Sequence, residues 1–225
     1  MKAIALFSGG KDSTYAIHLA LLQGFDIECL VTFIPQQHNS WMLHRPFAEY
    51  TVLQAKSMGL QHRIFRVSGI KELELQEIRD SLKEVVKEFN PSHLIIGALL
   101  SDYQRIRFSL IAEDLNLRTY LPLWRKNQSK YMLELIENGF EIIITSISAF
   151  GIPLKYLGKV LTLSDVLDII SRAQRYGFNP AFEGGEAETF VINSPFFRYR
   201  ICIEYEKYIL SQFEGYLKPI RAYLC

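Results

Sequence analysis

The sequence has few cysteines and no apolar run long enough to cross a membrane. Its three cysteines, Cys29, Cys202 and Cys225, include no C-x-x-C pair, and their number is odd. These features argue against a disulfide framework and an all-cysteine zinc site, and they fit a reducing compartment. The apolar run 3–7 is too short for the core of a signal peptide and leads into a Gly-Gly-Lys-Asp stretch. We therefore expect a cytoplasmic protein without a membrane segment.

The chain also lacks an excess of charge of either sign. Its 225 residues include 25 Lys and Arg against 24 Asp and Glu, for a formal net charge of +1. Non-specific nucleic-acid binding depends on a strongly basic surface, so direct binding of nucleic acid is not expected. Hydrophobic residues make up 49% of the chain, which is enough for a core in one large domain or two small ones.

Short apolar runs alternate with amphipathic segments in the first half of the chain. The expected strands are 3–7, 27–33, 62–67 and 94–96, and the expected helices are 13–23, 47–58, 71–89 and 102–116. This alternation predicts an α/β fold, a doubly wound parallel sheet with helices on both faces. Ligands of such sheets bind beyond the carboxyl ends of the strands.

The second half has a different pattern. Helices are expected at 129–138 and 163–176, and strands at 141–146, 189–193, 198–210 and 216–223. The aromatic and β-branched stretches near the end are typical of antiparallel strands. We therefore predict a smaller C-terminal α+β domain, with a soft boundary within 122–128, so that the domains are 1–125 and 126–225.

A glycine-rich loop joins the first expected strand to the first helix. Its glycines allow several backbone N–H groups to point into one concavity, and the helix N-terminus adds partial positive charge. Lysine and hydroxyl side chains complete a cradle for a polyphosphate, while the aspartate suggests a metal contact or a helix cap. The loop is not a Walker A motif, because Ala5 stands where that motif has glycine. The loop residues are Ser8, Gly9, Gly10, Lys11, Asp12 and Ser13.

The SGGKDS loop resembles the signature of the pyrophosphate-loop ATPases, also called adenine nucleotide α-hydrolases, which share the HUP-type sheet. Four further stretches are similar to the diphthine–ammonia ligase family: SWMLH at 40–44, GALLSDYQR at 97–105, PLW at 122–124 and EGGEAET at 183–189. The resemblance covers nearly the whole chain, and we expect the archaeal-type, single-module form without the extra C-terminal domains of eukaryotic relatives. One departure is Phe182, where many relatives carry glycine.

The resemblance implies a ligase that acts on elongation factor 2. ATP, with Mg²⁺, would activate the carboxylate of diphthine, a modified histidine, as an acyl-adenylate, and pyrophosphate would leave. Ammonia would then displace AMP to form the amide, diphthamide. A carboxylate is a poor electrophile and ammonia is mostly protonated at neutral pH, so activation and a nearby base are both needed.

Three carboxylates surround the Gly-Gly turn of EGGEAET. Glu183, Glu186 and Glu188 would repel one another unless a cation joins them. A solvated acidic turn is the plain alternative, but the resemblance favours a catalytic role, in which the cation is ammonium, magnesium or a basic group of the partner.

Other candidate residues lie near strand ends. Asp102 and Arg105 open a helix where a doubly wound sheet places ligand contacts, so we include them with Lys11 among the catalytic candidates. An ordinary surface helix with ion pairs is the alternative. We expect the adenine to bind along Val31, Thr32 and Phe33, and the nucleotide to approach His44 and Gly97. Asp12 is the candidate Mg²⁺ ligand.

Two alternative functions stay open. The chain could act on a small-molecule carboxylate, as in cobalamin-related salvage, or on a tRNA base, with the same cleavage of ATP. It could also be a non-catalytic ATP sensor, although that hypothesis leaves the acidic turn unexplained. A homodimer is compatible with the sequence.

Overall fold

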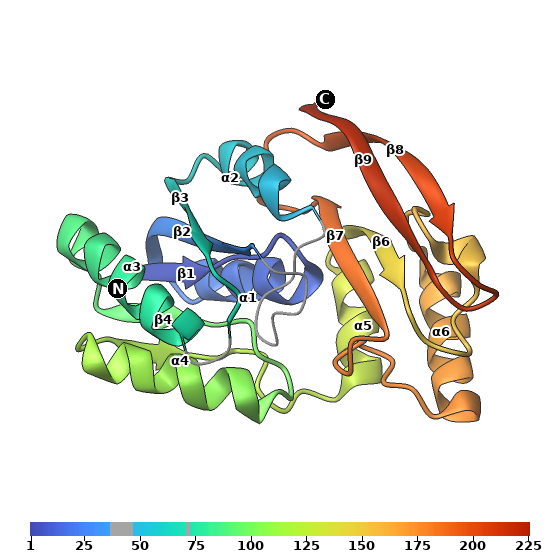
Figure 1. Ribbon diagram of the computed structural model, residues 1–225, viewed down its shortest axis with the longest axis horizontal. Coiled ribbons are helices and arrows are strands. Elements are labelled where there is room, and N and C mark those ends of the chain that lie inside the picture. The colour runs from blue at the N-terminus through green and yellow to red at the C-terminus, as the bar shows by residue number, and fades with distance from the viewer. Residues whose placement is uncertain (37–46, 71–72) are drawn as a thin grey trace. The chain divides into compact units, whose positions relative to one another are not determined.

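The computed structural model describes residues 1–36, 47–70 and 73–225 (Figure 1). The chain divides into two units. The first combines Met1–Ser8 with Asp12–Trp124, and the second combines Gly9–Lys11 with Arg125–Cys225. Within the described residues, no helix has both the length and the apolar character that crossing a membrane requires.

The first unit is built on a parallel sheet with the strand order β3-β2-β1-β4-β5. The predicted doubly wound α/β architecture is therefore confirmed. Because strands follow one another outward from β1 in one direction and from β4 in the other, the switch point lies between β1 and β4. The elements are β1 (Lys2–Leu6), α1 (Lys11–Leu22), β2 (Asp26–Pro35), a 3-10 turn (Ala48–Tyr50), α2 (Thr51–Met58), β3 (His62–Val67), α3 (Leu73–Phe89), β4 (His93–Ile95), α4 (Asp102–Asp114) and β5 (Arg118–Tyr120).

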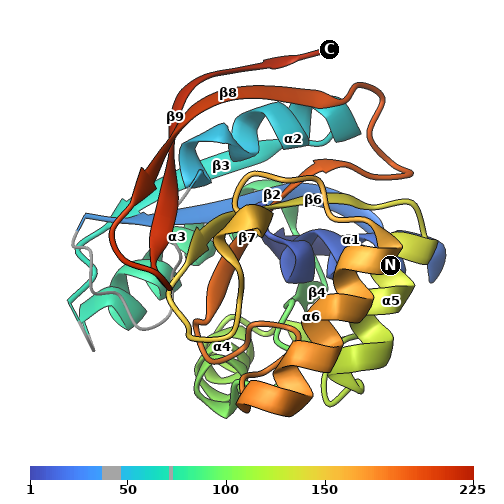
Figure 2. The same cartoon turned by 90° about the vertical axis from the view of Figure 1, so that its right-hand side faces the viewer.

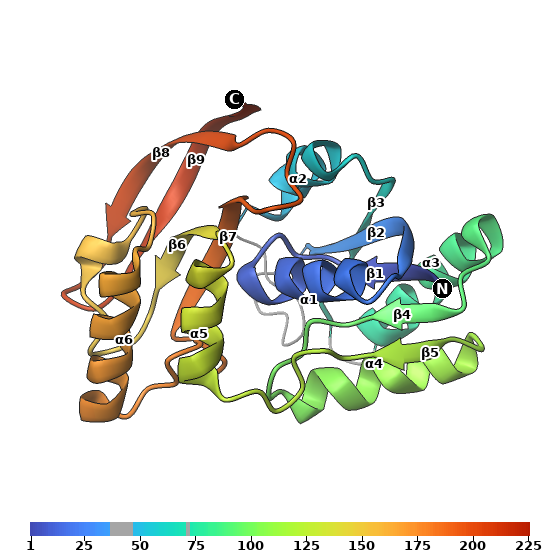
Figure 3. The same ribbon diagram turned by 180° about the vertical axis from the view of Figure 1, so that it is seen from behind.

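Helices cover both faces of this sheet. A core cluster on one face joins β-strand residues such as Ile4 and Val31 to Leu82 of α3 and Phe108 of α4, all of them buried. Helix α1 lies on the opposite face, in front of β1 in Figure 3 and behind it in Figure 1. The near-continuous apolar strands follow from this double coverage, since neither face meets water.

The second unit contains an antiparallel sheet with the order β7-β6-β9-β8. Helices α5 and α6 lie on one side of β6 and β7 (Figures 1 and 3). Strands β8 and β9 continue beyond their contact with β6 as a long two-stranded ribbon (Figure 2). The elements are α5 (Gln128–Glu137), β6 (Glu141–Ile147), a 3-10 turn (Leu154–Tyr156), α6 (Leu163–Tyr176), β7 (Ala187–Asn193), β8 (Ile201–Ile209) and β9 (Gly215–Leu224).

The structure corrects the expectation that the cysteines do not form disulfides. Cys202 and Cys225 are bonded to each other, while Cys29 is free and buried. The antiparallel register explains the pairing, because Ile201 lies opposite Leu224 and so brings the end of β9 beside the start of β8. A sequence separation of 23 residues gave no sign of this proximity.

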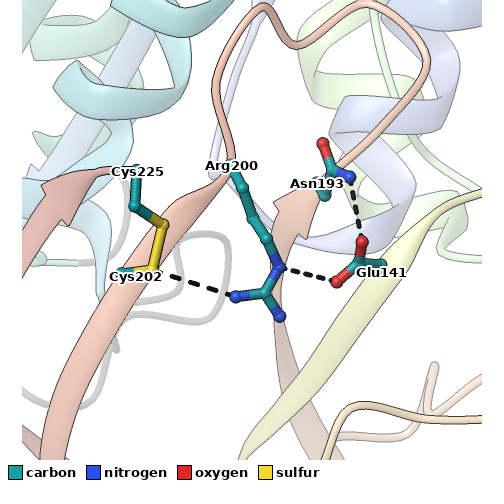
Figure 4. Close-up of a disulfide and its surroundings, with 5 residues drawn as sticks. All are labelled: Glu141, Asn193, Arg200, Cys202 and Cys225. Atoms are coloured by element: carbon teal, nitrogen blue, oxygen red, sulfur yellow. Dashed lines mark hydrogen bonds and ion pairs between the residues drawn. A yellow bond between two sulfur atoms is a disulfide. The ribbon is translucent and has the colours of Figure 1, made fainter.

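A polar cluster lies next to the disulfide (Figure 4). The Glu141 carboxylate accepts hydrogen bonds from Nε of Arg200 at 2.8 Å and from Nδ2 of Asn193 at 2.9 Å. Burial alone would raise the pKa of Glu141, but these two hydrogen bonds and the charge of Arg200 lower it overall. Because Glu141 belongs to β6, the cluster ties the segment that precedes β8 to the centre of the sheet.

Candidate active site

The glycine-rich loop turns at the carboxyl end of β1, beside the switch point. Ser8 and Ser13, at its two ends, are in contact: the Ser8 N–H donates to the Ser13 hydroxyl at 3.2 Å, and the two hydroxyl oxygens are 3.1 Å apart. Gly9 has a φ of 78°, a conformation that favours glycine. The loop therefore closes on itself at the N-terminus of α1, as a polyphosphate cradle requires.

Gly97, just after β4, packs directly against the first turn of α1. A Cβ atom at this position would lie 2.8 Å from the Cα and N atoms of Ser13 and 2.9 Å from the carbonyl carbon of Asp12. No side chain fits there. The glycine thus lets the exit of β4 approach the helix N-terminus, which explains the residue without any contact to a ligand.

The middle of the loop belongs to the second unit, where it contacts β7. The Val191 N–H donates to the Gly9 carbonyl at 3.0 Å, and the Lys11 N–H donates to Oγ1 of Thr189 at 3.2 Å. The Lys11 ammonium lies 5.8 Å from the centroid of the Phe182 ring. Lys11 is 3% exposed, so its cation is held in a largely dehydrated setting.

The acidic turn is held together by Glu186. One carboxylate oxygen accepts from the Asn179 N–H and the other from the Gly184 N–H, each at 2.8 Å. A Cβ at Gly184 would lie 2.8 Å from the Glu186 carboxylate, so a larger residue there would displace this carboxylate. Glu186 therefore shapes the turn. The sequence suggested a catalytic role for this residue and gave no sign of the structural one.

The two other carboxylates of the turn differ in setting. Glu188 and Thr189 are consecutive residues of β7, so their side chains point to opposite faces of the strand. Since Thr189 contacts the Lys11 N–H, Glu188 faces away from that contact. Glu183 precedes the Gly-Gly pair and is half-buried. Of the three carboxylates, Glu186 binds backbone N–H groups of the turn, while Glu188 lies on the face of β7 opposite to Thr189.

Sequence reasoning missed two residues that hold the acidic turn in place. The Ser148 hydroxyl donates to the Gly185 carbonyl at 2.7 Å, and its N–H donates to the Glu186 carbonyl at 2.9 Å. Asn179 accepts from the Ala181 N–H through Oδ1 at 2.8 Å. A lone serine or asparagine in a loop carries no signal of such a role.

The start of α4 contains the predicted pair Asp102 and Arg105. Ser101 caps the helix by accepting from the Gln104 N–H. Arg105 donates to Oδ1 of Asp102 from two nitrogens, at 3.0 and 2.7 Å, and its guanidinium lies 4.8 Å from the Trp124 ring centroid. The two candidates thus form an exposed ion pair with each other. This is what an ordinary surface helix without a catalytic role would also show.

The end of β2 carries the residues predicted to meet adenine. Phe7 donates its N–H to the Val31 carbonyl at 2.8 Å, so the backbone groups of Val31 point toward β1. Backbone N–H and C=O groups alternate in direction along a parallel strand, so those of Thr32 point toward β3 and those of Phe33 point back to the β1 side. The pairing of β1 with β2 ends at Leu6 and Val31, so Phe33 lies beyond it. This is a suitable position for backbone recognition of a base.

The Thr32 side chain is part of a buried network. Its hydroxyl donates to the Phe7 carbonyl at 2.7 Å and contacts Nε2 of His62 at 2.8 Å. Burial, assisted by the charge of Arg63, lowers the pKa of His62 to about 4. The imidazole is therefore neutral at pH 7 and donates its Nε2 proton to Thr32.

His44 was predicted to lie near the nucleotide. It lies outside the described residues, as does the rest of the 40–44 motif. Within the described ranges, no three His, Cys, Asp or Glu side chains form a cluster able to hold a metal ion. A single half-buried carboxylate, Asp12, still fits Mg²⁺, since this ion is commonly bound by one or two carboxylates together with substrate phosphates.

Family models match both units of the chain. The diphthamide synthase N-terminal domain matches residues 1–119, and the diphthamide synthase C-terminal domain matches residues 127–224. The chain belongs to the diphthamide synthase family. Proteins of this family from zebrafish (Danio rerio) and human, both named diphthine–ammonia ligase, are 32% identical over 91% of the chain and 28% identical over 96% of it.

Relatives in the diphthamide synthase family differ in length. The similarity covers 87% of the zebrafish protein and 88% of the human one, but 39% of the diphthine–ammonia ligase of Schizosaccharomyces pombe, which is 26% identical over the whole chain. Large additional regions are thus not general among the eukaryotic relatives. A solved structure described as a tRNA methyltransferase subunit from Methanocaldococcus jannaschii has a TM-score of 0.46 and 20% identity, over 87% of this chain and 98% of that one.

Proposed function

We propose that the protein amidates diphthine on elongation factor 2, using ATP and ammonia. The observation that carries this proposal is the match of both family domains, in a chain whose relatives are named diphthine–ammonia ligase. The reaction has two steps. The diphthine carboxylate attacks the α-phosphorus of ATP and pyrophosphate leaves; ammonia then attacks the acyl-adenylate carbon, AMP leaves, and a proton is released.

Residues 1–125 would form the ATP-binding part. We assign the polyphosphate to Ser8, Gly9, Gly10, Lys11 and Ser13, because hydroxyls, a lysine and a helix N-terminus converge on this loop. Asp12 would contribute a ligand to Mg²⁺, which neutralises phosphate charge when bound. The adenine is assigned to the backbone at Val31, Thr32 and Phe33, with Gly97 supporting the loop, and His44 remains a nucleotide-binding candidate from the sequence alone.

Residues 126–225 would bind the protein substrate. In this assignment Glu183 and Glu188 attract ammonium and accept its proton, while Glu186 keeps the turn in shape. Arg105 would meet the α-phosphate or the substrate carboxylate after its ion pair with Asp102 opens. The partners are elongation factor 2 and ammonium, and we place the protein in the cytoplasm.

The test is a product analysis with α-labelled ATP, Mg²⁺, ammonium and elongation factor 2 that carries diphthine. We expect AMP and amidated histidine only when all components are present. Lys11→Ala should lower turnover by at least about 100-fold, because a cation at the polyphosphate is lost. Lys83→Ala, which removes an exposed lysine of α3, is the matched control and should leave turnover unchanged.

Other products would point elsewhere. AMP without amidation would transfer the proposal to a small carboxylate or a tRNA base. ADP would overturn the assignment of α-phosphate chemistry, and binding of ATP without turnover in any mixture would indicate a sensor.

A further inference from the structure

Phe182 has a backbone conformation that phenylalanine rarely adopts. Its φ is +63°, in the left-handed region, where a bulky side chain is strained. The turn around it enforces this conformation: the Phe182 N–H donates to the Asn179 carbonyl at 2.9 Å, and the Gly185 N–H donates to the Phe182 carbonyl at 3.3 Å. Glu186 fixes both ends of the same turn by accepting from the N–H groups of Asn179 and Gly184.

This strained residue presents its ring to Lys11. The Lys11 ammonium lies 5.8 Å from the ring centroid, within the range of a cation–π interaction. Phe182 is 5% exposed and Lys11 is 3% exposed. Because water competes weakly for a buried cation, the attraction between the ring and the ammonium is stronger here than on a surface.

We propose that Phe182 is a positioning residue for Lys11, and that the acidic turn orients the phosphate-binding lysine through this ring. The proposal deepens the function proposed above and rests on it. A lysine side chain has several rotatable bonds, whose freedom is lost when the ammonium engages a polyphosphate. A ring that already restricts the ammonium lowers this cost, so ATP binds more tightly.

A second set of contacts holds the backbone of Lys11. The backbone of Lys11 is fixed by the hydrogen bond of its N–H to Thr189, and Gly9 is fixed by Val191, so the base of the side chain is held by β7. The ring of Phe182 acts at the other end, on the ammonium. The main chain and the charge of Lys11 are thus held by two separate parts of the second unit.

The test compares variants that keep or remove the aromatic face. Phe182→Leu and Phe182→Met keep an apolar side chain of similar size but lose the π-system, whereas Phe182→Tyr keeps it. Binding of α,β-methylene-ATP, which resists cleavage between the α- and β-phosphates, is measured by calorimetry at fixed salt. We expect Kd to rise roughly 3- to 30-fold for the Leu and Met variants and to stay within about threefold of wild type for the Tyr variant.

A double-mutant cycle separates positioning from packing. In a Lys11→Met background, Phe182→Leu should cause no further loss of nucleotide affinity, because the ring then has no cation to orient. Equal losses in both backgrounds, or wild-type affinity in the Leu and Met variants, would overturn the proposal even if those variants melt at a lower temperature. If wild type itself does not bind the nucleotide, the proposed function fails, and the role of Phe182 fails with it.

Discussion

Single side chains in the candidate site act largely through backbone groups. Ser148, Asn179 and Glu186 all bind main-chain atoms in or next to the acidic turn, and Thr189 accepts from a main-chain N–H of the glycine-rich loop. Such contacts define the positions of the turn and the loop more narrowly than side-chain pairs do, since the backbone itself is held. Substituting one of these residues would move several neighbours together.

His62 provides a prediction about pH. Its folded-state pKa, about 4, is below the value of 6.5 for an exposed imidazole. The unfolded chain therefore binds a proton at a higher pH than the folded one, so stability is complete above pH 6.5 and is lost as the pH falls toward 4. We expect His62 to account for at most about 3 kcal/mol of this loss.

Urea unfolding of wild type and His62→Gln between about pH 4 and 8 measures this effect. Glutamine keeps an N–H donor for Thr32 and does not titrate, so the two stability curves should run parallel above pH 6.5 and converge or cross below it. Parallel curves over the whole range would show that the imidazole is not kept neutral by the fold.

The sequence revealed candidate side chains better than their roles. SGGKDS predicts a phosphate loop because its residue types have few other uses at a strand–helix junction, and the structure places the motif at such a junction, between β1 and α1. Glu186 was predicted as a carboxylate that meets a cation, yet its oxygens bind two backbone N–H groups of its own turn. That outcome depends on the left-handed conformations of Phe182 and Gly185, which a motif does not encode.

At the scale of elements, the contact between the exit of β4 and the first turn of α1 governs the loop. Gly97→Ala would place a methyl group 2.8 Å from the backbone of Ser13. We expect a destabilisation of about 1–3 kcal/mol and, because α1 must shift, a loss of roughly 10- to 100-fold in turnover.

Gly24→Ala is the matched control for Gly97→Ala. Gly24 has a φ of +79°, but no atom lies within 4 Å of the position that an added methyl group would take. The substitution should therefore cost about 1 kcal/mol in backbone strain and leave turnover intact. The comparison combines urea unfolding with the rate of AMP release. Wild-type turnover in Gly97→Ala would show that the first turn of α1 tolerates displacement.

Elements with strong patterns were predicted well. Helix α6 runs over Leu163–Tyr176 as expected, since its apolar residues recur on one face and both ends are marked: a capping box at Thr162 and Asp165, and Gly177 in the left-handed region. Strand β5 was missed because Arg118–Tyr120 has three residues and no apolar run. The strand forms because it pairs with the free edge of β4, a tertiary contact that the local sequence does not encode.

At the scale of the whole molecule, the disulfide closes the end of the β8–β9 ribbon. Replacing both Cys202 and Cys225 by serine should lower the free energy of unfolding by roughly 3 kcal/mol, because the unfolded chain loses a covalent loop across a separation of 23 residues. Urea unfolding with and without dithiothreitol measures it: reductant should bring wild type to the stability of the double variant and leave that variant unchanged. A urea midpoint of wild type that does not change on addition of dithiothreitol would contradict the prediction.

Three residues of the first loop, Gly9–Lys11, belong to the same unit as Arg125–Cys225, which are made much later in translation. The hydrogen bond from Lys11 to Thr189 spans 178 positions. During synthesis the first five strands leave the ribosome long before β7 does, so the parallel sheet can form while the loop at its edge still lacks Thr189 and Val191. The loop therefore acquires its final shape only after β7 has been made, and a chain that stops early would carry the motif without its finished conformation.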